Sequence, residues 1–527
     1  MAMVAVPLLI IISAWFSPAN DVWLHLSQTL LPELLRNTAV LVLGVGSGVL
    51  LLGVGSAWVT IMYEFPGRRF FDWALMLPLA IPSYVLAFVM VGLFDVTGPI
   101  AMTLHGQLGI PFNQIPSIRS SFGIVLVMSL ALYPYVYMLA RVAFLGQGRL
   151  AMESARALGL RPSQAFIQVA LPMARPAIAA GLSLALMETL ADFGAVSVFN
   201  YNTFTTAIYE SWFGLFNLQA AAQLASMLLL FVCILLYIER SSRHGAKYHS
   251  QSSIHRRQPL TGWRAKVACG LLGLLFTIAF AIPLCQLIIW AVSSFAIEID
   301  PRYLQLLWHT LLIGGMAMVV TVTGAFILSF CRKLYATGNI RRAMPLATLG
   351  YALPGSVLAI GIMMSFTWID RGLIIPTQEW FGLQPRQWLT GSLIALILAY
   401  FVRFLSVAYG PIDAALERVK PVLQESARIL GANQREIIHS LYILILRPGF
   451  FAAALLVLVD VMKEMPATLL LRPFDWDTLA VLIYELTSEG EWERAALPAL
   501  TLVLVGLLPV ILLIKQSDQS QQNGASS

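Results

Sequence analysis

Four acidic residues stand inside long apolar stretches of this chain, as two pairs with the same spacing. Glu188 and Asp192 are four residues apart, as are Asp460 and Glu464, and Lys463 directly precedes the last of these. A spacing of four places both members of a pair on one face of a helix. Because carboxylates suit hard, highly charged cations, the pairs are a candidate anionic lining for a cation in transit. A structural reading, in which Lys463 neutralises Asp460 or Glu464, remains open.

The depth of these acids gives them weight. Glu188 follows Pro176 by twelve residues, which places it about 18 Å along a helix that enters the membrane. That is near the middle of an apolar core about 30 Å thick. A charge at this depth is costly and usually faces a cavity or a partner.

A second polar feature, Glu-Ser-Ala-Arg-x-Leu-Gly, occurs at 153–159 and again at 425–431. Each copy ends at a glycine, which can adopt positive φ and end a helix. Pro162 then suits the first turn of a new helix, and in the second copy Asn433 and Glu436 form a capping-box pair. A short polar helix across the face of a membrane protein fits the cleft of a soluble partner. A loop that only caps the bundle is the alternative.

Both copies are followed by an apolar helix face. The residues of this face are Ala165, Phe166, Val169 and Ala170 after the first copy, and Ile437, Ile438, Leu441 and Tyr442 after the second.

Composition defines the elements that must position these residues. The chain has 527 residues, of which 58% are hydrophobic and 11% charged, whereas a soluble protein carries about a quarter charged residues. The apolar runs are long and continuous, which predicts an all-α integral membrane protein. We expect about twelve transmembrane helices, at roughly 3–16, 38–62, 71–95, 122–144, 176–197, 217–238, 267–292, 308–330, 344–367, 390–412, 449–471 and 495–514.

The distribution of cations predicts the orientation. With the N-terminus in the cytoplasm, the inside loops receive most Lys and Arg residues, Arg141 and the cations from Arg403 to Arg447 among them. The C-terminus is then cytoplasmic as well. This asymmetry accounts for the net charge of +6, so no nucleic-acid partner is needed to explain it.

An internal repeat organises the chain. The offset of 272 residues between Glu153 and Glu425 also relates Ile81–Ala87 to Leu353–Ala359. Such a register predicts two homologous six-helix halves, parallel and related by an axis along the membrane normal. We assign 1–238 to the first half, with a coupling loop at about 145–176, and 264–515 to the second, with one at about 413–448. Residues 239–263 are predicted to be a flexible cytoplasmic linker and 516–527 a disordered tail.

Here the chain resembles a known family. The pattern Glu-x-Ala-x-x-x-Gly, followed in the first copy by Leu171-Pro172, is similar to the signature loop of ABC-importer permeases, although Ile443-Leu444 replaces Leu-Pro in the second copy. The resemblance implies a type I ABC-importer permease fold and a coupling helix that docks into an ATPase subunit. The residues that carry the motif are Glu153, Ala155, Gly159, Glu425, Ala427 and Gly431.

Three further stretches, 188–196, 203–209 and 462–474, resemble ferric-iron importer permeases. Permeases for thiamine, phosphonates or polyamines share much of this layout and remain alternatives. The resemblance implies a bacterial inner-membrane protein that works with two copies of a cytoplasmic ABC ATPase and a periplasmic substrate-binding protein, surrounded by membrane lipid.

The sequence also disfavours other functions. It contains no G-x-x-x-x-G-K-[ST] loop, so we expect ATP and Mg²⁺ to be bound by the separate ATPase and no cofactor in this chain. We assign no catalytic residue and no fixed metal site, because no acid–base set or ligand cluster converges in the sequence. An ion-coupled secondary transporter is the rival of another class, but it has no reason to repeat the coupling motif.

Overall fold

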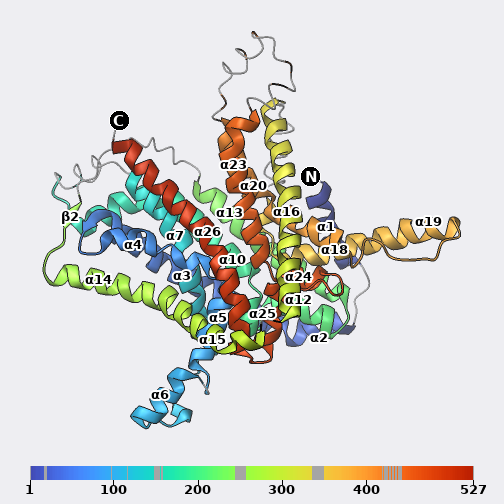
Figure 1. Cartoon of the computed structure of the whole chain (residues 1–527), viewed down its shortest axis with the longest axis horizontal. Coiled ribbons are helices and arrows are strands. Elements are labelled where there is room, and N and C mark those ends of the chain that lie inside the picture. Colours follow the sequence, from blue (N-terminus) through green and yellow to red (C-terminus); the bar gives the residue numbers. More distant parts are fainter. Residues whose placement is uncertain are drawn as a thin grey trace. The chain divides into compact units, whose positions relative to one another are not determined.

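The computed structural model is built almost entirely of helices, which Figure 1 labels in chain order. It describes residues 2–16, 21–96, 98–114, 117–146, 155, 158–243, 257–298, 300–334, 349–417, 419, 425, 429, 433, 436 and 442–525. The predicted all-α membrane fold is confirmed. Helices satisfy every backbone hydrogen bond within their own segment, which an apolar bilayer requires.

The first half of the chain contains α1 (Ala2–Ser13), η1 (Ala14–Phe16), α2 (Asp21–Thr29), α3 (Leu31–Met62), β1 (Tyr63–Glu64), α4 (Arg68–Ala74), η2 (Leu77–Ala80), α5 (Ser83–Phe94), α6 (Pro99–Leu108), η3 (Phe112–Gln114), α7 (Ser121–Gly146), α9 (Pro162–Ala165), η4 (Phe166–Ala170), α10 (Leu171–Ala191), α11 (Gly194–Val198), α12 (Phe204–Tyr209), η5 (Glu210–Gly214) and α13 (Leu218–Arg243).

The second half contains β2 (Gln258–Pro259), α14 (Trp263–Phe276), η6 (Thr277–Ala281), α15 (Ile282–Glu298), α16 (Pro301–Leu334), η7 (Leu349–Ala352), α18 (Gly355–Ile369), η8 (Asp370–Ile374), α19 (Ile375–Trp380), α20 (Leu393–Glu417), α23 (Ile443–Lys463), α24 (Pro466–Leu471), α25 (Leu479–Ser488) and α26 (Trp492–Ala525).

Within the described residues, eleven helices are long and apolar enough to cross a membrane. The predicted number was about twelve, and the first predicted helix accounts for the difference. That segment, Met3–Phe16, is an apolar helix but a short one. At 1.5 Å per residue it is about 21 Å long, less than the apolar core of about 30 Å.

Two other predicted helices, 71–95 and 344–367, begin later than expected. Pro82 and Pro354 are the N-cap residues of α5 and α18, with nearly the same extended backbone (φ −56°, ψ 145° and φ −56°, ψ 139°). A short 3₁₀ helix precedes each of them, η2 and η7. Proline has no N–H to donate and disfavours helical backbone before it, so each apolar run is divided at the same point of the repeat.

The described helices form two compact units that differ from the two sequence halves. One unit consists of residues 1–22, 208–227 and 299–482, and the other of 23–207, 228–298 and 483–527. Each unit therefore combines most of one repeat with helices from the other.

In the first of these units, the N-terminal helix α1 packs against α18. The contact is close, because a Cβ added at Gly361 would lie 2.8 Å from the carbonyl oxygen of Pro7. Helices α16, α20 and α23 form the core, in which Tyr400, Phe404 and Val457 are fully buried. Helix α1 of the first repeat is thus part of the second repeat's packing.

In the other unit, α3, α7 and α10 pack together at small residues. A Cβ at Gly53 would lie 2.7 Å from Val136, and one at Gly181 would lie 2.8 Å from the same residue. Helix α15, from the second repeat, packs on α5 and α26. Because α5 and α18 are 272 residues apart, the contacts α1–α18 and α15–α5 are equivalent within the repeat.

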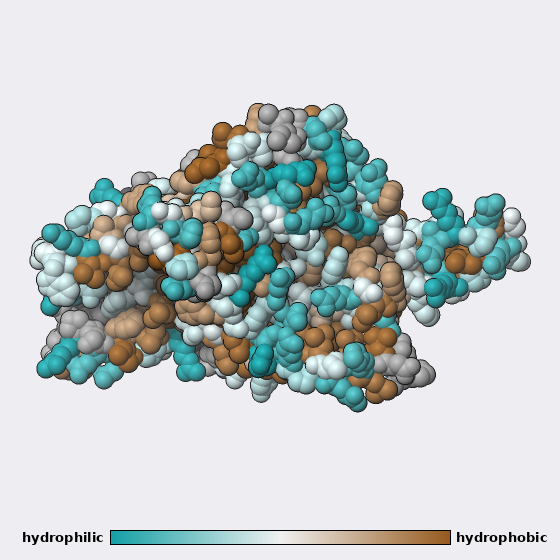
Figure 2. Space-filling model, turned by 90° about the horizontal axis from the view of Figure 1, so that it is seen from below, coloured by the Kyte–Doolittle hydropathy of each residue, from teal (hydrophilic) through white to brown (hydrophobic). Residues whose placement is uncertain are grey.

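Many apolar side chains remain exposed on the helices, as Figure 2 shows for one face in brown. Examples are Leu43, Leu51, Val292 and Val319. Such exposure is expected where helices face lipid rather than water.

The predicted linker and tail are more regular than expected. Helix α13 continues to Arg243, and residues 258–259 form the strand β2, so both ends of the linker 239–263 have defined structure. Helix α26 extends to Ala525, where the sequence predicted a disordered tail from residue 516. Extending an existing helix adds one hydrogen bond per residue without a new nucleus, which favours the continuation.

Candidate coupling and translocation sites

The first coupling segment ends as its glycine predicts. Gly159 adopts φ +85°, and the amide of Leu160 donates to the carbonyl oxygen of Ala155 at 3.1 Å. This i to i−5 bond is the closing bond of a Schellman turn. The Ala155 side chain is buried, whereas Glu153 lies outside the described residues.

The helix after this turn begins at Pro162, the first residue of α9, and its predicted apolar face is confirmed. Ala165 and Ala170 are buried, and the ring of Phe166 lies 4.4 Å from that of Trp58 on α3. The turn at Gly159 is thus held against the membrane helices by aromatic packing.

The second coupling segment contains the predicted capping box. The amide of Asn433 donates to Glu436 Oε2 at 2.8 Å, and the amide of Glu436 donates to Asn433 Oδ1 at 3.0 Å. This reciprocal pair defines a helix start. Glu425 is exposed, while Ala427 and Gly431 lie outside the described residues.

The helix that leads into each coupling segment is held by an ion pair near its end. In α7, Arg141 donates to both carboxylate oxygens of Asp72, at 2.7 and 2.9 Å. In α20, Arg332 donates to both oxygens of Asp413, at 2.7 Å each. Arg141 and Asp413 occupy equivalent positions of the repeat. Arg141, which the sequence reading counted among loop cations, is a buried helix residue.

Asp192 lies at the break between α10 and α11, where its backbone is extended. Its Oδ1 accepts the amides of Ala195 at 2.9 Å and Val196 at 3.2 Å, and Ser83 donates to Oδ2 at 2.5 Å. The carboxylate therefore caps α11 and joins it to the start of α5. Ser83 had no assigned role in the sequence reading.

Glu464 occupies the equivalent position of the second repeat, at the break between α23 and α24. It is buried, and its Oε2 lies 3.2 Å from Nε of Arg403 on α20. Arg403 also donates to the carbonyl oxygen of Leu353 at 3.1 Å. The side chain of Gly355, the counterpart of Ser83, is absent, and the Glu464 carboxylate and Arg403 guanidinium occupy that space.

The placement of Arg403 corrects the sequence reading, which counted it with the cytoplasmic loop cations. It is a buried residue in the middle of α20. One signal in the sequence could have identified it: a cation inside the predicted helix 390–412 needs an acidic partner at the same depth. Its distance of 61 residues from Glu464 hid which acid that is.

The remaining acids differ from each other. Asp460 lies close enough to Lys463 for their charges to interact. Its counterpart Glu188 is half-buried on α10 and has no ion pair or hydrogen-bond partner within the described part of the chain. With Arg403 included, four carboxylates face two cations, which leaves a formal charge of −2 for the set. The set can therefore attract a cation without saturating it.

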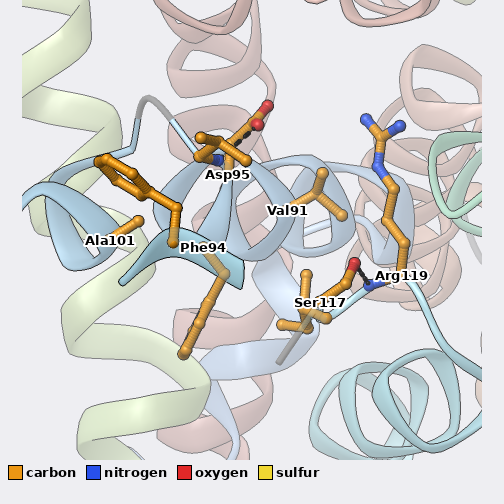
Figure 3. Close-up of a pocket in the computed structure, with 9 residues that line it drawn as sticks. Val91, Phe94, Asp95, Ala101, Ser117 and Arg119 are labelled. Atoms are coloured by element: carbon orange, nitrogen blue, oxygen red, sulfur yellow. Dashed lines mark hydrogen bonds between the residues drawn. The ribbon is translucent and has the colours of Figure 1, made fainter. Parts of the chain in front are cut away.

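No three His, Cys, Asp or Glu residues of the described segments lie close enough together to hold a metal ion. A cavity of about 180 Å³ lies elsewhere, beside the end of α5 and α6, with Asp95 and Arg119 at its rim (Figure 3). Asp95 accepts the amide of Val96 at 2.7 Å and the indole N–H of Trp492 at 3.3 Å. None of the predicted site residues lines this cavity.

Comparison with known proteins identifies the class. The family described as binding-protein-dependent transport system inner membrane component matches residues 49–240. This range includes the first coupling segment, Glu188 and Asp192. The chain thus carries a permease domain of this family, and the predicted resemblance to importer permeases is confirmed.

Individual relatives extend this match. Over 493 residues the chain is 28% identical to the Fe(3+)-transport system permease protein FbpB 2 of Haemophilus influenzae, which covers 92% of this chain and 90% of that protein. It is 31% identical over 186 residues to the sulfate transport system permease protein CysT of Salmonella typhimurium, covering 34% of this chain and 65% of that protein. A bacterial alginate ABC transporter, solved in complex with alginate pentasaccharide-bound periplasmic protein, aligns with 17% identity and a TM-score of 0.40, covering 47% of this chain and 92% of that chain.

Proposed function

We propose that this chain is the membrane permease of an ATP-driven importer that moves ferric iron, delivered by a periplasmic binding protein, across the bacterial inner membrane. The observation that carries the substrate is the extent of similarity. The ferric-iron permease matches 92% of the chain, including both repeats, whereas the sulfate and molybdenum permeases match 28–34% of it.

The energy for transport comes from a separate ATPase, of which two copies bind, one at each coupling segment. The supporting observation is that both segments have defined helix boundaries, at Gly159 and at Asn433–Glu436. ATP binding to the partner must favour one permease conformation over the other, because a ligand shifts an equilibrium only by its differential affinity. Both chain termini lie in the cytoplasm in this proposal.

The iron passes the acids of α10 and α23, namely Glu188, Asp192, Asp460, Lys463 and Glu464. Within this set, Glu188 carries most of the interaction with the cation. The carboxylates of Asp192 and Glu464 already accept hydrogen bonds or an ion pair, and Asp460 faces Lys463. Weak, one-sided attraction suits transit, because a transported ion must also leave the site.

Reconstitution in vesicles with the ATPase and a binding protein tests the substrate. We expect ATP-dependent uptake of iron with the iron-loaded binding protein. Uptake of sulfate, molybdate, thiamine, a phosphonate or a polyamine in its place would overturn the assignment. Uptake that persists without ATP but stops when the ion gradient collapses would identify a secondary transporter.

Glu188→Gln tests the pathway. Because the substitution removes a charge that has no described partner, we expect iron uptake to fall about tenfold while folding and ATPase binding stay unchanged, a loss that corresponds to about 1.4 kcal/mol. Glu489→Gln, at an exposed position after α25, is the matched control and should transport normally. Wild-type uptake by Glu188→Gln would remove Glu188 from the pathway.

A further inference from the structure

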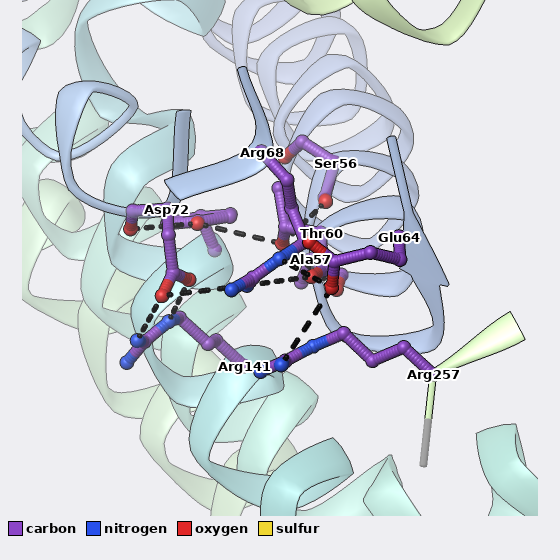
Figure 4. A network of polar contacts seen from close by, with 9 residues as sticks. Ser56, Ala57, Thr60, Glu64, Arg68, Asp72, Arg141 and Arg257 are labelled. Carbon is purple, nitrogen blue, oxygen red and sulfur yellow. Dashed lines mark hydrogen bonds and ion pairs between the residues drawn. The ribbon is translucent and has the colours of Figure 1, made fainter. Parts of the chain in front are cut away.

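A chain of alternating charges joins the end of the inter-repeat linker to helix α7 (Figure 4). Arg257 Nη1 lies 3.8 Å from Glu64 Oε2, and the same oxygen lies 3.1 Å from Nε of Arg68. Arg68 Nη1 lies 3.9 Å from Asp72, which pairs with Arg141 on α7. The chain of contacts ends five residues before the last residue of α7, where the route to the first coupling segment begins.

Main-chain contacts hold the linker at this place. Strands β1 and β2 pair in parallel, with Tyr63 opposite Gln258 and Glu64 opposite Pro259. The amide of Leu260 donates to the carbonyl oxygen of Glu64 at 2.9 Å. We call residues 257–260, together with 63–64, the linker clasp.

Charge balance alone does not account for Arg257. Arg68 and Arg141 already match Glu64 and Asp72, so the third guanidinium gives the cluster an excess positive charge. Burial lowers the pKa of Arg257, and the nearby Arg68 lowers it further. An unbalanced, partly desolvated cation is costly, so its position indicates a role other than local stability.

The clasp also sets the position of a membrane helix. Three residues after Leu260, the chain enters α14, which packs on α4. The rings of Phe70 and Phe276 lie 5.3 Å apart at this contact. Helix α4 is therefore joined to α14 by the clasp and aromatic packing, and to α7 by Asp72 and Arg141.

We propose that the linker clasp is a positioning element of the transport cycle, which transmits movement of the first coupling segment through α7 and α4 to α14. This inference rests on the proposed function, because it requires an ATPase at the coupling segment. The second repeat reaches a similar end differently: Arg332 contacts Asp413 directly, and Lys333 donates to the carbonyl oxygens of Leu416 and Val419 at 2.8 and 2.9 Å.

Arg257→Gln in the full complex with ATPase and binding protein tests the clasp. We expect the complex to assemble, but ATP hydrolysis without binding protein to rise about fivefold, the lower end of allosteric coupling between sites. Arg264→Gln removes the same charge at an exposed position of α14 and should behave as wild type, while Arg257→Lys should restore most of the coupling. Equal ATPase rates for Arg257→Gln and Arg264→Gln would overturn the proposal.

A disulfide provides a second measurement that does not depend on the arginine. In a background with the four cysteines replaced by serine, Tyr63→Cys and Gln258→Cys should cross-link on oxidation. A protease site inserted at residue 250 reports the bond, because the cleaved halves then stay joined without reductant. The cross-link should also lower the raised ATPase rate of Arg257→Gln. Failure to cross-link, or no effect on that rate, would contradict the clasp.

These measurements separate the clasp from the substrate. Wild-type complex that does not import iron would refute the proposed substrate, yet the comparison of ATPase rates in the variants would still decide the clasp.

Discussion

At the scale of single residues, the two repeats solve one problem in two ways. Each needs an acidic group to cap the short helix after a break in a membrane helix. The first repeat uses Asp192 with the hydroxyl of Ser83. The second uses the longer Glu464, which caps with Oε1 to the amide of Ala467 at 3.3 Å and pairs with Arg403.

This difference predicts unequal costs of substitution. Arg403→Met leaves the Glu464 carboxylate buried without its cation, and we expect it to lower the free energy of unfolding by about 3–5 kcal/mol. Arg403→Met combined with Glu464→Gln removes both charges and should recover most of that loss. Unfolding of the purified protein in detergent measures both variants. A double variant no more stable than the single one would show that the ion pair is not the source of the cost.

The Gly355 position follows from the same geometry. A Cβ there would meet the Glu464 carboxylate and lie 3.0 Å from Arg403 Nη1. We expect Gly355→Ser to destabilise the protein by about 1–3 kcal/mol, as overpacking typically does. The reverse exchange, Ser83→Gly, removes only one hydrogen bond to Asp192 and should cost about 1 kcal/mol. Thermal unfolding distinguishes the two, and a larger loss for Ser83→Gly would contradict the assignment.

At the scale of elements, the coupling segments depend on how their helices end and begin. Gly159 has positive φ, which asparagine tolerates better than other non-glycine residues. We expect Gly159→Asn to keep transport, whereas Gly159→Asp with Gly431→Asp places two charges at the carbonyl ends of helices, where anions are unfavourable. Transport per ATP hydrolysed should then fall about tenfold, or about 1.4 kcal/mol. Normal transport by the double variant would refute the docking role.

At the scale of the whole molecule, each compact unit uses helices from both repeats. Helix α1 packs on α18, next to Gly361. Deleting residues 2–16 should therefore increase hydrogen exchange in α18 of the second repeat and leave α5 of the first repeat protected, because local stability follows local packing. Loss of protection in α5 alone would contradict the exchange of helices between repeats.

The sequence by itself determined the membrane class, most helix positions, the two repeats and the two coupling segments. These features follow from local rules: apolar length, the positive φ open to glycine at Gly159, and the reciprocal hydrogen bonds of Asn433 and Glu436. Each can be read within a few residues of the position concerned.

The tertiary structure alone decided which residues meet across long separations. The pairing of Glu464 with Arg403, the packing of α1 on α18 and the contact of Arg257 with Glu64 leave no periodic trace in the sequence. Their partners are chosen by how helices pack, and packing depends on the shapes of surfaces that form only when distant segments come together.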